Sequence, residues 1–224
     1  MSDSLLAYTT LGAGGCTIGA FTFTSFTRQG LSEGATAIDG ISVTPVSGGG
    51  LFGLDFTLNQ GAVESFVGIE SVSAPPTTVL ESRISFQLTG TPTARLNAST
   101  ITLNGAGTTG DGNVSAIQNL CVGGRFIDPY TPGACSAGGT PDAQNVVFIT
   151  GIPELTSSTL AFLPTMMLAV MNDIVVDGGT AGSATLDSVS NRFTAAAAAV
   201  PEPAPLLLIG AGLISLFLRR RRSR

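Results

Sequence analysis

The side chains that carry most enzyme chemistry are missing from this chain. Its 224 residues include no His and no Lys. Ser-His-Asp and Cys-His arrangements are therefore excluded, as are lysine Schiff bases and the lysine of a phosphate-binding loop. A pair of carboxylates, as used in glycoside hydrolysis, is the catalytic option that is left.

The acidic residues of the body show no pairing along the sequence. Turns attract Asp and strand ends carry charge, so we interpret these acids as solvated turn and strand-end residues. The sequence therefore predicts a non-enzymatic protein without a cofactor, and a carboxylate-based hydrolase is the least favoured alternative. The acids in question are Asp39, Asp55, Glu64, Glu70, Glu81, Asp111, Asp128, Asp142, Glu154, Asp173, Asp177 and Asp187.

Two acidic loops contain the oxygen ligands that Ca²⁺ prefers. They are Asp111-Gly112-Asn113 and Asp177-Gly178-Gly179. Neither loop continues into the spacing of a calcium loop with a closing Glu. Turn formation explains both, and we predict no metal site.

Three cysteines allow one disulfide and leave one thiol over. Cys121 and Cys135 flank a stretch rich in Gly and Pro, and we predict that they close this loop in an exported protein. Two alternatives stay open: Cys16 pairs with one of them, or all three thiols are free. Metal binding is disfavoured, because neither a His nor a CxxC pair accompanies the cysteines.

Charge is divided unevenly between the body and the C-terminus. All ten basic residues are Arg, and five of them lie in the last six positions. Residues 1–218 therefore combine five Arg with all fifteen Asp and Glu, a net charge of −10. Such an acidic body argues against nucleic-acid binding, which needs a cationic face. The five terminal arginines are Arg219, Arg220, Arg221, Arg222 and Arg224.

The C-terminal residues have the sequence features of a short membrane segment. A small-residue linker with a Pro-Glu-Pro motif occupies 195–203, and an uncharged apolar run follows over 204–218. As a helix this run would be about 22 Å long, which is shorter than a hydrocarbon core of about 30 Å. The terminal arginines resist translocation. We therefore predict a transmembrane helix at 204–218, a cytoplasmic tail at 219–224 and an exported body at 1–194.

This arrangement resembles the PEP-CTERM sorting signal, in which a Pro-Glu-Pro motif, a short transmembrane helix and an Arg-rich end mark substrates of exosortase. The resemblance covers about 200–224. It implies that Pro201, Glu202 and Pro203 are the recognised residues and that an exosortase-type membrane protease is the partner. It also implies an exported protein that is anchored through its C-terminus before processing and then reaches the cell surface or the extracellular space. An ordinary tail anchor behind a linker is the alternative.

The signal and the missing catalytic residues together predict a surface or extracellular-matrix protein, retained among secreted polysaccharide. A secreted carbohydrate-binding module is the alternative. Sugar sites usually present aromatic platforms, whereas this chain has no Trp and only Tyr8 and Tyr130.

The N-terminus differs from the family pattern, which normally starts with a secretory signal peptide. Residues 1–4 are polar and slightly acidic, and the following apolar run is short. Either the sequence lacks its leader, or export does not use the usual route. The stretch 11–16 is similar to a lipoprotein cleavage site, but no hydrophobic run precedes it, and we do not expect Cys16 to carry a lipid.

Short runs typical of strands fill the body, and each is bounded by Gly, Pro, Asn or Asp. They predict an all-β fold, an antiparallel β-sandwich or jelly roll. The first run alternates Phe and Thr and then slips by one residue, which predicts a bulge or an early end. The run at 160–176 contains Pro164 and predicts one or two buried central strands. Loose motifs at 14–19, 172–174 and 188–193 resemble the body domain of many PEP-CTERM proteins. The ten runs are 21–26, 41–44, 51–58, 65–72, 84–88, 96–103, 114–121, 146–150, 160–176 and 184–193.

Overall fold

The computed structural model describes most of the body. It covers residues 2–28, 32, 34–38, 40–59, 72–127, 135–136, 140–149 and 154–196, without the side chains of 140–145. The predicted linker beyond 196, the predicted transmembrane helix at 204–218 and the predicted tail at 219–224 lie outside these residues. So does most of the expected strand at 65–72.

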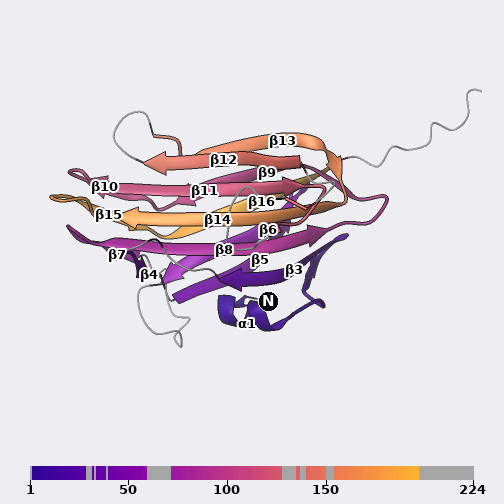
Figure 1. The fold of residues 1–224 in the computed structure, drawn as a ribbon, viewed down its shortest axis with the longest axis horizontal. Helices are drawn as coiled ribbons and strands as arrows, with labels where there is room; N and C mark the ends of the chain where they lie inside the picture. The colour runs from indigo at the N-terminus through magenta and orange to yellow at the C-terminus, as the bar shows by residue number, and fades with distance from the viewer. Residues whose placement is uncertain are drawn as a thin grey trace, which may run out of the picture.

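The described body consists of antiparallel sheets (Figure 1), which confirms the predicted all-β class. One sheet has the order β1-β5-β6-β16-β9-β13. The second has the order β12-β11-β14-β8-β3-β2, and β4 pairs with β8 in the only parallel pairing of the described strands. A small third sheet has the order β10-β15-β7. The strands are β1 (Asp3–Ser4), β2 (Cys16–Ile18), β3 (Phe21–Arg28), β4 (Thr36–Ala37), β5 (Gly40–Gly48), β6 (Leu51–Asn59), β7 (Val72–Ala74), β8 (Val79–Thr89), β9 (Arg95–Asn104), β10 (Gly107–Thr109), β11 (Asn113–Val122), β12 (Thr140–Ile149), β13 (Ser157–Thr165), β14 (Met167–Asp177), β15 (Ser183–Leu186) and β16 (Ser188–Ala196).

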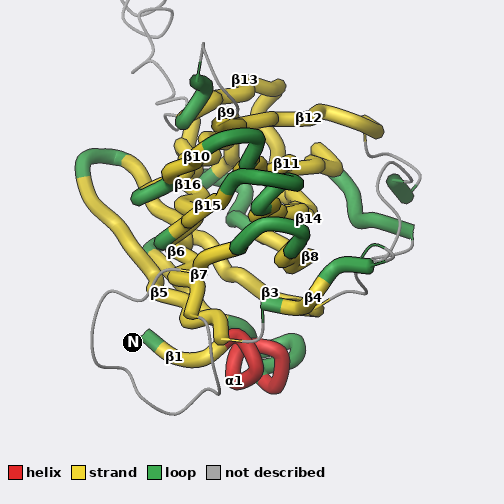
Figure 2. The backbone as a smooth tube through the Cα atoms, turned by 90° about the vertical axis from the view of Figure 1, so that its left-hand side faces the viewer, coloured by secondary structure: helices red, strands yellow, loops and turns green. Residues whose placement is uncertain are grey.

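The two large sheets pack face to face, and Figure 2 shows them end-on as two layers. Phenylalanines from both sheets meet between the layers. Phe23 of β3 lies 6.0 Å from Phe193 of β16 and 6.1 Å from Phe86 of β8, measured between ring centroids. Each fully buried Phe contributes roughly 1.5–3 kcal/mol through removal of apolar surface from water. This aromatic cluster is therefore a main source of cohesion between the sheets.

A buried polar chain also joins the two layers. The hydroxyl of Ser99 in β9 donates to Gln118 Oε1 in β11 at 2.8 Å, and Gln118 Nε2 donates to Asn191 Oδ1 in β16. All three residues are fully buried. Burying a polar group without a hydrogen-bond partner costs free energy. These paired side chains therefore favour the one alignment of the two sheets in which their hydrogen bonds form.

The strand predictions hold in detail at β3. Its pairing with β8 shifts between Thr24 and Thr27, and Ser25 between them has a φ of 56°. The slip in the Phe-Thr alternation therefore marks a real irregularity, as predicted from the sequence.

The run at 160–176 is divided between two strands of different character. β14 is a buried central strand, as expected. β13 lies at the edge of its sheet, where it pairs with β9, and Leu163 in it is 85% exposed. The expectation of buried strands is thus wrong for the first half, because apolar residues at an edge strand are covered from one side only.

One short helix, α1 (Leu5–Thr10), was not predicted. Ser4 forms its N-cap and accepts a hydrogen bond from the Ala7 N–H at 3.2 Å. Leu5 and Tyr8 are buried, and Tyr8 packs against Phe26 of β3. A Ser followed by apolar residues three positions apart is a helix-start signal that sequence reasoning missed.

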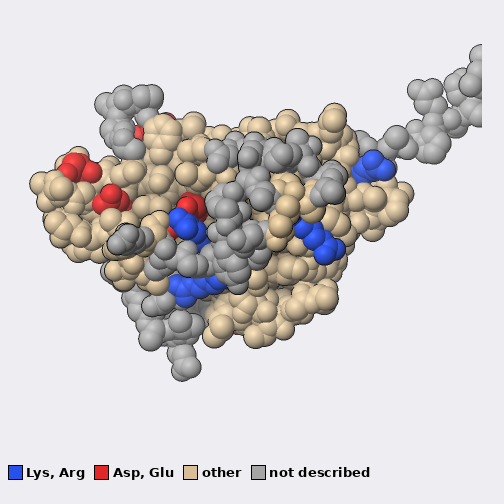
Figure 3. All heavy atoms as spheres, in the orientation of Figure 1, with Lys and Arg blue, Asp and Glu red and all other residues tan. Residues whose placement is uncertain are grey.

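The body has two distinct ends, which we name the exit pole and the far pole. At the exit pole, Ala196 pairs with Arg95, and the chain continues from there to the C-terminal segment. The β8–β9 turn and Met166 lie at this end. At the far pole lie the turns that contain Asp111 and Asp177. Figure 3 shows acidic side chains on the left, on the far-pole side, and in the middle, and basic ones from the middle toward the right.

Candidate functional site

The predicted sorting motif is attached to a strand in the interior of its sheet. Pro201, Glu202 and Pro203 lie outside the described residues, as do Arg219, Arg220, Arg221, Arg222 and Arg224. The strand that leads to them, β16, pairs with β6 on one side and β9 on the other. It extends to Ala196, two residues beyond the body boundary at 194. A force on the C-terminal segment would therefore act on the backbone hydrogen bonds of β16 with both β6 and β9.

The helix α1 has six residues. Within the described ranges, none of the helical residues form a segment with the length and apolar character needed to cross a bilayer. The predicted span at 204–218 falls outside those ranges.

Two acids that the sequence left unpaired meet at one arginine. The register of β8 and β14 places Asp173 opposite Arg83, and Arg83 Nε lies 3.1 Å from Asp173 Oδ2. Arg83 Nη2 lies 2.9 Å from Glu81 Oε1. The backbone N–H and the hydroxyl of Ser32 both donate to Glu81, at 2.7 and 3.2 Å. The cluster thus ties Ser32 to the outer face of the sheet.

The environment of this cluster suits an ion-pair network better than catalysis. Glu81 is only 1% exposed, so a substrate would have little access to its carboxylate. Burial raises the pKa of Asp173, Arg83 opposes that rise, and the nearby Glu81 adds to it. A general acid and base must both reach the reacting atoms. Here Arg83 and Ser32 occupy the positions around Glu81 instead.

The two loops considered for calcium lie side by side at the far pole. Asp111 accepts hydrogen bonds from the Thr180 N–H at 2.8 Å, the Thr180 hydroxyl at 2.5 Å and the Ala181 N–H at 2.9 Å. These bonds, led by the Thr180 hydroxyl, hold the pKa of Asp111 well below its usual range. Asp177 accepts from the Gly179 N–H at 2.8 Å. Both carboxylates therefore act as turn caps, which agrees with the turn interpretation.

Groups of His, Cys, Asp and Glu able to hold a metal do not occur among the residues that the structure describes. Glu81 and Asp173 bind Arg83, and Asp55 binds Arg192. Asp111 and Asp177 cap the turns at the far pole.

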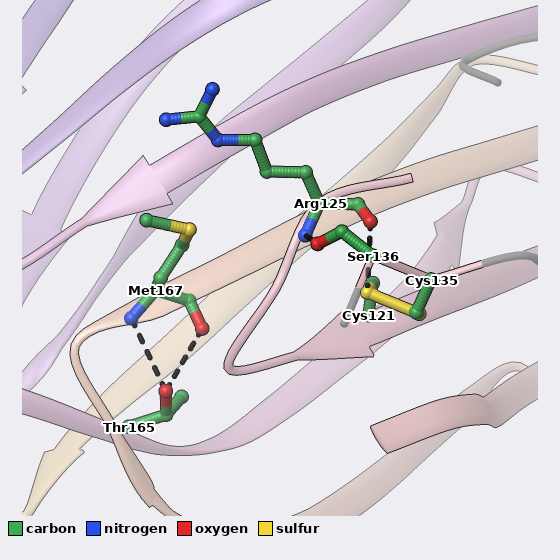
Figure 4. Close-up of a disulfide and its surroundings, with 6 residues drawn as sticks. All are labelled: Cys121, Arg125, Cys135, Ser136, Thr165 and Met167. Carbon is green, nitrogen blue, oxygen red and sulfur yellow. Dashed lines mark hydrogen bonds between the residues drawn. A yellow bond between two sulfur atoms is a disulfide. The ribbon is translucent and has the colours of Figure 1, made fainter. Parts of the chain in front are cut away.

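Cys121 and Cys135 are joined by a disulfide, with 5.8 Å between their Cα atoms (Figure 4). The bond sits beside a short backbone pairing in which the Ser136 N–H donates to the Arg125 carbonyl at 2.8 Å. The Arg125 N–H donates to the Ser136 hydroxyl at 3.1 Å. Cys16 is the free cysteine and is partly buried against the core. The disulfide therefore fixes the backbone that carries Arg125.

Arg125 borders a polar hollow at the edge of the exit pole. The hollow measures about 450 Å³. Thr22 and Thr24 of β3 line it, together with Gln87 and Thr89 of β8, which face them across the strand pair. Hydroxyl and amide groups beside a guanidinium can bind polar or anionic ligands. Sequence reasoning missed this site. The alternation of side chains along a strand shows which residues share a face of the sheet, but it does not show which strand lies next to it.

Comparison with known proteins identifies the C-terminus of the chain. No curated protein matches the chain. A family model, the PEP-CTERM protein-sorting motif, matches residues 199–222. This range contains Pro201, Glu202 and Pro203, the predicted apolar span and the first four terminal arginines. The motif indicates an exported protein that exosortase processes, and the recognition made from sequence is confirmed: this chain carries a PEP-CTERM sorting signal at its C-terminus.

Proposed function

We propose that the chain is a non-enzymatic cell-surface or extracellular-matrix protein, delivered by its C-terminal signal and retained among secreted polysaccharide. The single observation that carries the proposal is the sorting motif at 199–222, placed directly behind the last strand of a folded β body. In this account the span at 204–218 anchors the protein, and the terminal arginines stay on the cytoplasmic side. Exosortase then acts near Pro201, Glu202 and Pro203.

The short span supports a temporary anchor. Fifteen apolar residues make a helix of about 22 Å, so the bilayer must thin or draw flanking residues into the interface. Pro201, Pro203 and Pro205 hold the preceding backbone extended, because proline removes amide donors and disfavours helix before it. An extended segment just outside the membrane is accessible to a membrane protease.

The chemistry of the body supports a non-enzymatic role. The chain has no His and no Lys. Two carboxylates come together in the described part of the body, those of Glu81 and Asp173, and both bind Arg83. A retained surface protein needs a stable fold and a delivery signal. The β body and the C-terminal motif meet these two needs, and neither requires a catalytic side chain.

Substitution of the motif in the native host tests the proposal. Replacing Pro201, Glu202 and Pro203 by Ala should leave the protein unprocessed and in the membrane fraction. The matched control replaces Ala197 and Ala198 by Ser, just before the matched range. It keeps linker length and small side chains, and it should be processed like the wild type. Equal processing and equal location of the motif variant and the wild type would overturn the proposal.

A carbohydrate-binding module is the second candidate, and the hollow beside Arg125 favours it. Its lining of Thr, Gln and Arg side chains offers hydrogen bonds to sugar hydroxyls. Binding of the full chain to a glycan array, lost on Gln87→Ala, would support this role. Absence of saturable binding would remove it and leave the surface-protein proposal intact.

A further inference from the structure

We propose that the exit pole is a membrane-contact surface that rests on the anionic lipid bilayer in which the chain is anchored. The inference rests on the proposed function, because it requires the span at 204–218 to be inserted. It adds an orientation to that function: the body stands on the bilayer with its exit pole down and its far pole outward.

Exposed apolar side chains gather at the exit pole. Leu51, the first residue of β6, is 41% exposed and pairs with Thr194 near the end of β16. Leu163 is 85% exposed in the last part of β13, whose Thr165 pairs with Leu96. Met166, in the turn that follows, is 42% exposed. Apolar side chains at such positions gain by entering the interface of a bilayer.

Two arginines complement this apolar group. Arg95 is exposed and pairs through its backbone with Ala196, the last described residue of the chain. Arg125 is exposed on the loop that the disulfide fixes. A guanidinium binds phosphate groups through paired N–H donors and is attracted by the negative potential of an anionic membrane.

Negative charge lies elsewhere on the described surface. Asp111, Glu154, Asp177 and Asp187 belong to loops and strand ends at the far pole. Among the acids whose side chains the structure describes, the others lie along the middle of the strands and not at the exit pole. Figure 3 shows red side chains on the left, both colours in the middle and blue ones on the right. An anionic surface would therefore attract the exit pole and repel the far pole.

The length of the linker restricts which part of the body can reach the bilayer. Seven residues, 197–203, separate Ala196 from the predicted span. At about 3.5 Å per residue, the eight steps from 196 to 204 cover at most about 28 Å. A span that is too short for the bilayer draws its flanking residues toward the interface and shortens this distance further. The exit pole is the surface held at the membrane.

Tryptophan fluorescence provides the test, because the chain contains no Trp and a single introduced one reports its own surroundings. The full chain would be reconstituted into phosphatidylglycerol vesicles with brominated acyl chains, which quench Trp on close approach. Leu163→Trp at the exit pole should be quenched relative to vesicles without bromine. Leu155→Trp, a 40% exposed apolar position on the far-pole side, is the matched control and should not be quenched.

Charge variants test the role of the arginines. Arg95→Gln with Arg125→Gln would be combined with Leu163→Trp. The equilibrium constant for contact between the body and the bilayer should fall roughly thirtyfold, because each arginine near an anionic surface contributes about 1 kcal/mol. Thr109→Glu with Thr156→Glu changes the net charge equally at the far pole and should leave quenching unchanged.

Two failures are distinguishable in this design. A chain that floats with the vesicles while Leu163→Trp and Leu155→Trp are quenched equally or not at all overturns the exit-pole contact and leaves the anchor intact. A chain that does not float with the vesicles overturns the anchor on which the inference rests.

Discussion

The exit pole and the far pole belong to the same strands and yet differ in surface chemistry. At the far pole, Asp111 and Asp177 cap tight turns and bring negative charge to the loops. At the exit pole, Arg95 and Arg125 are exposed beside apolar side chains such as Leu163. Because the core does not dictate what strand ends expose, this difference points to unlike surroundings for the two ends.

The largest effect is expected from opening the disulfide near the exit pole. Cys121 and Cys135 are 14 positions apart, and closing a loop of this size stabilises a fold by about 3 kcal/mol. Cys121→Ser with Cys135→Ser should lower the free energy of unfolding by that order in urea titrations. Cys16→Ser is the control and should cost less than about 1 kcal/mol, since Cys16 is free and only partly buried. Equal stability of the double variant and the wild type would contradict the assignment of a structural disulfide.

A smaller effect is expected at the turns of the far pole. A Cβ atom on Gly182 would collide with the carbonyl oxygen of Thr109 and the backbone nitrogens of Gly112 and Asp111. Gly182→Ala should therefore cost about 2 kcal/mol of unfolding free energy through backbone displacement. Gly48→Ala near the exit pole is the matched control, because nothing lies within 4 Å of its added Cβ. Similar melting temperatures for the two variants would show that the far-pole turns are loosely packed.

The far-pole turns should also depend on pH. Three hydrogen bonds hold the pKa of Asp111 below its usual range, so its ionised form stabilises the folded state at neutral pH. This contribution is lost as the pH falls below about 4, the usual pKa of Asp, toward the folded value. Asp111→Asn should lower the melting temperature at pH 7, by less than Gly182→Ala does, and the difference from the wild type should shrink at low pH. A difference that is constant from pH 7 to pH 2 would rule out the charge as its origin.

The smallest effect on stability is expected at the exposed apolar residues. Leu163 is 85% exposed, so Leu163→Ser should change the unfolding free energy by no more than about 0.5 kcal/mol. Leu54→Ser is the contrasting control, because Leu54 is fully buried in β6 and its loss should cost several kcal/mol, roughly 2–5 as in other core truncations. A large loss of stability from Leu163→Ser would mean that this side chain serves the fold and not a surface function.

The strands could be predicted where side chains alternate with a period of two. The Phe-Thr run at the start of β3 predicted both the strand and its irregularity. A strand with one buried face has apolar residues at every second position, and the run departs from this alternation where the irregularity lies. The Gly, Pro, Asn and Asp residues that bound the runs likewise indicated short strands joined by turns. These features depend on local sequence, which explains why they could be read without the structure.

Pairings between distant strands could not be predicted. Arg83 and Asp173 are 90 positions apart, and only the register of β8 against β14 brings them together. The same holds for the hollow, where β3, β8 and the loop of Arg125 meet. The edge position of β13 was missed for this reason too, since an apolar run does not show whether a strand pairs on one side or on both. The sorting motif, by contrast, is one continuous stretch of sequence and could be recognised without the structure.

Removal of the C-terminal signal during delivery can be tested on the intact mass of the mature protein from its native host. We expect a mass that lacks the span at 204–218 and the tail at 219–224, with a new C-terminus near Pro201, Glu202 and Pro203. A surface-located protein whose mass still includes every residue through Arg224 would contradict it.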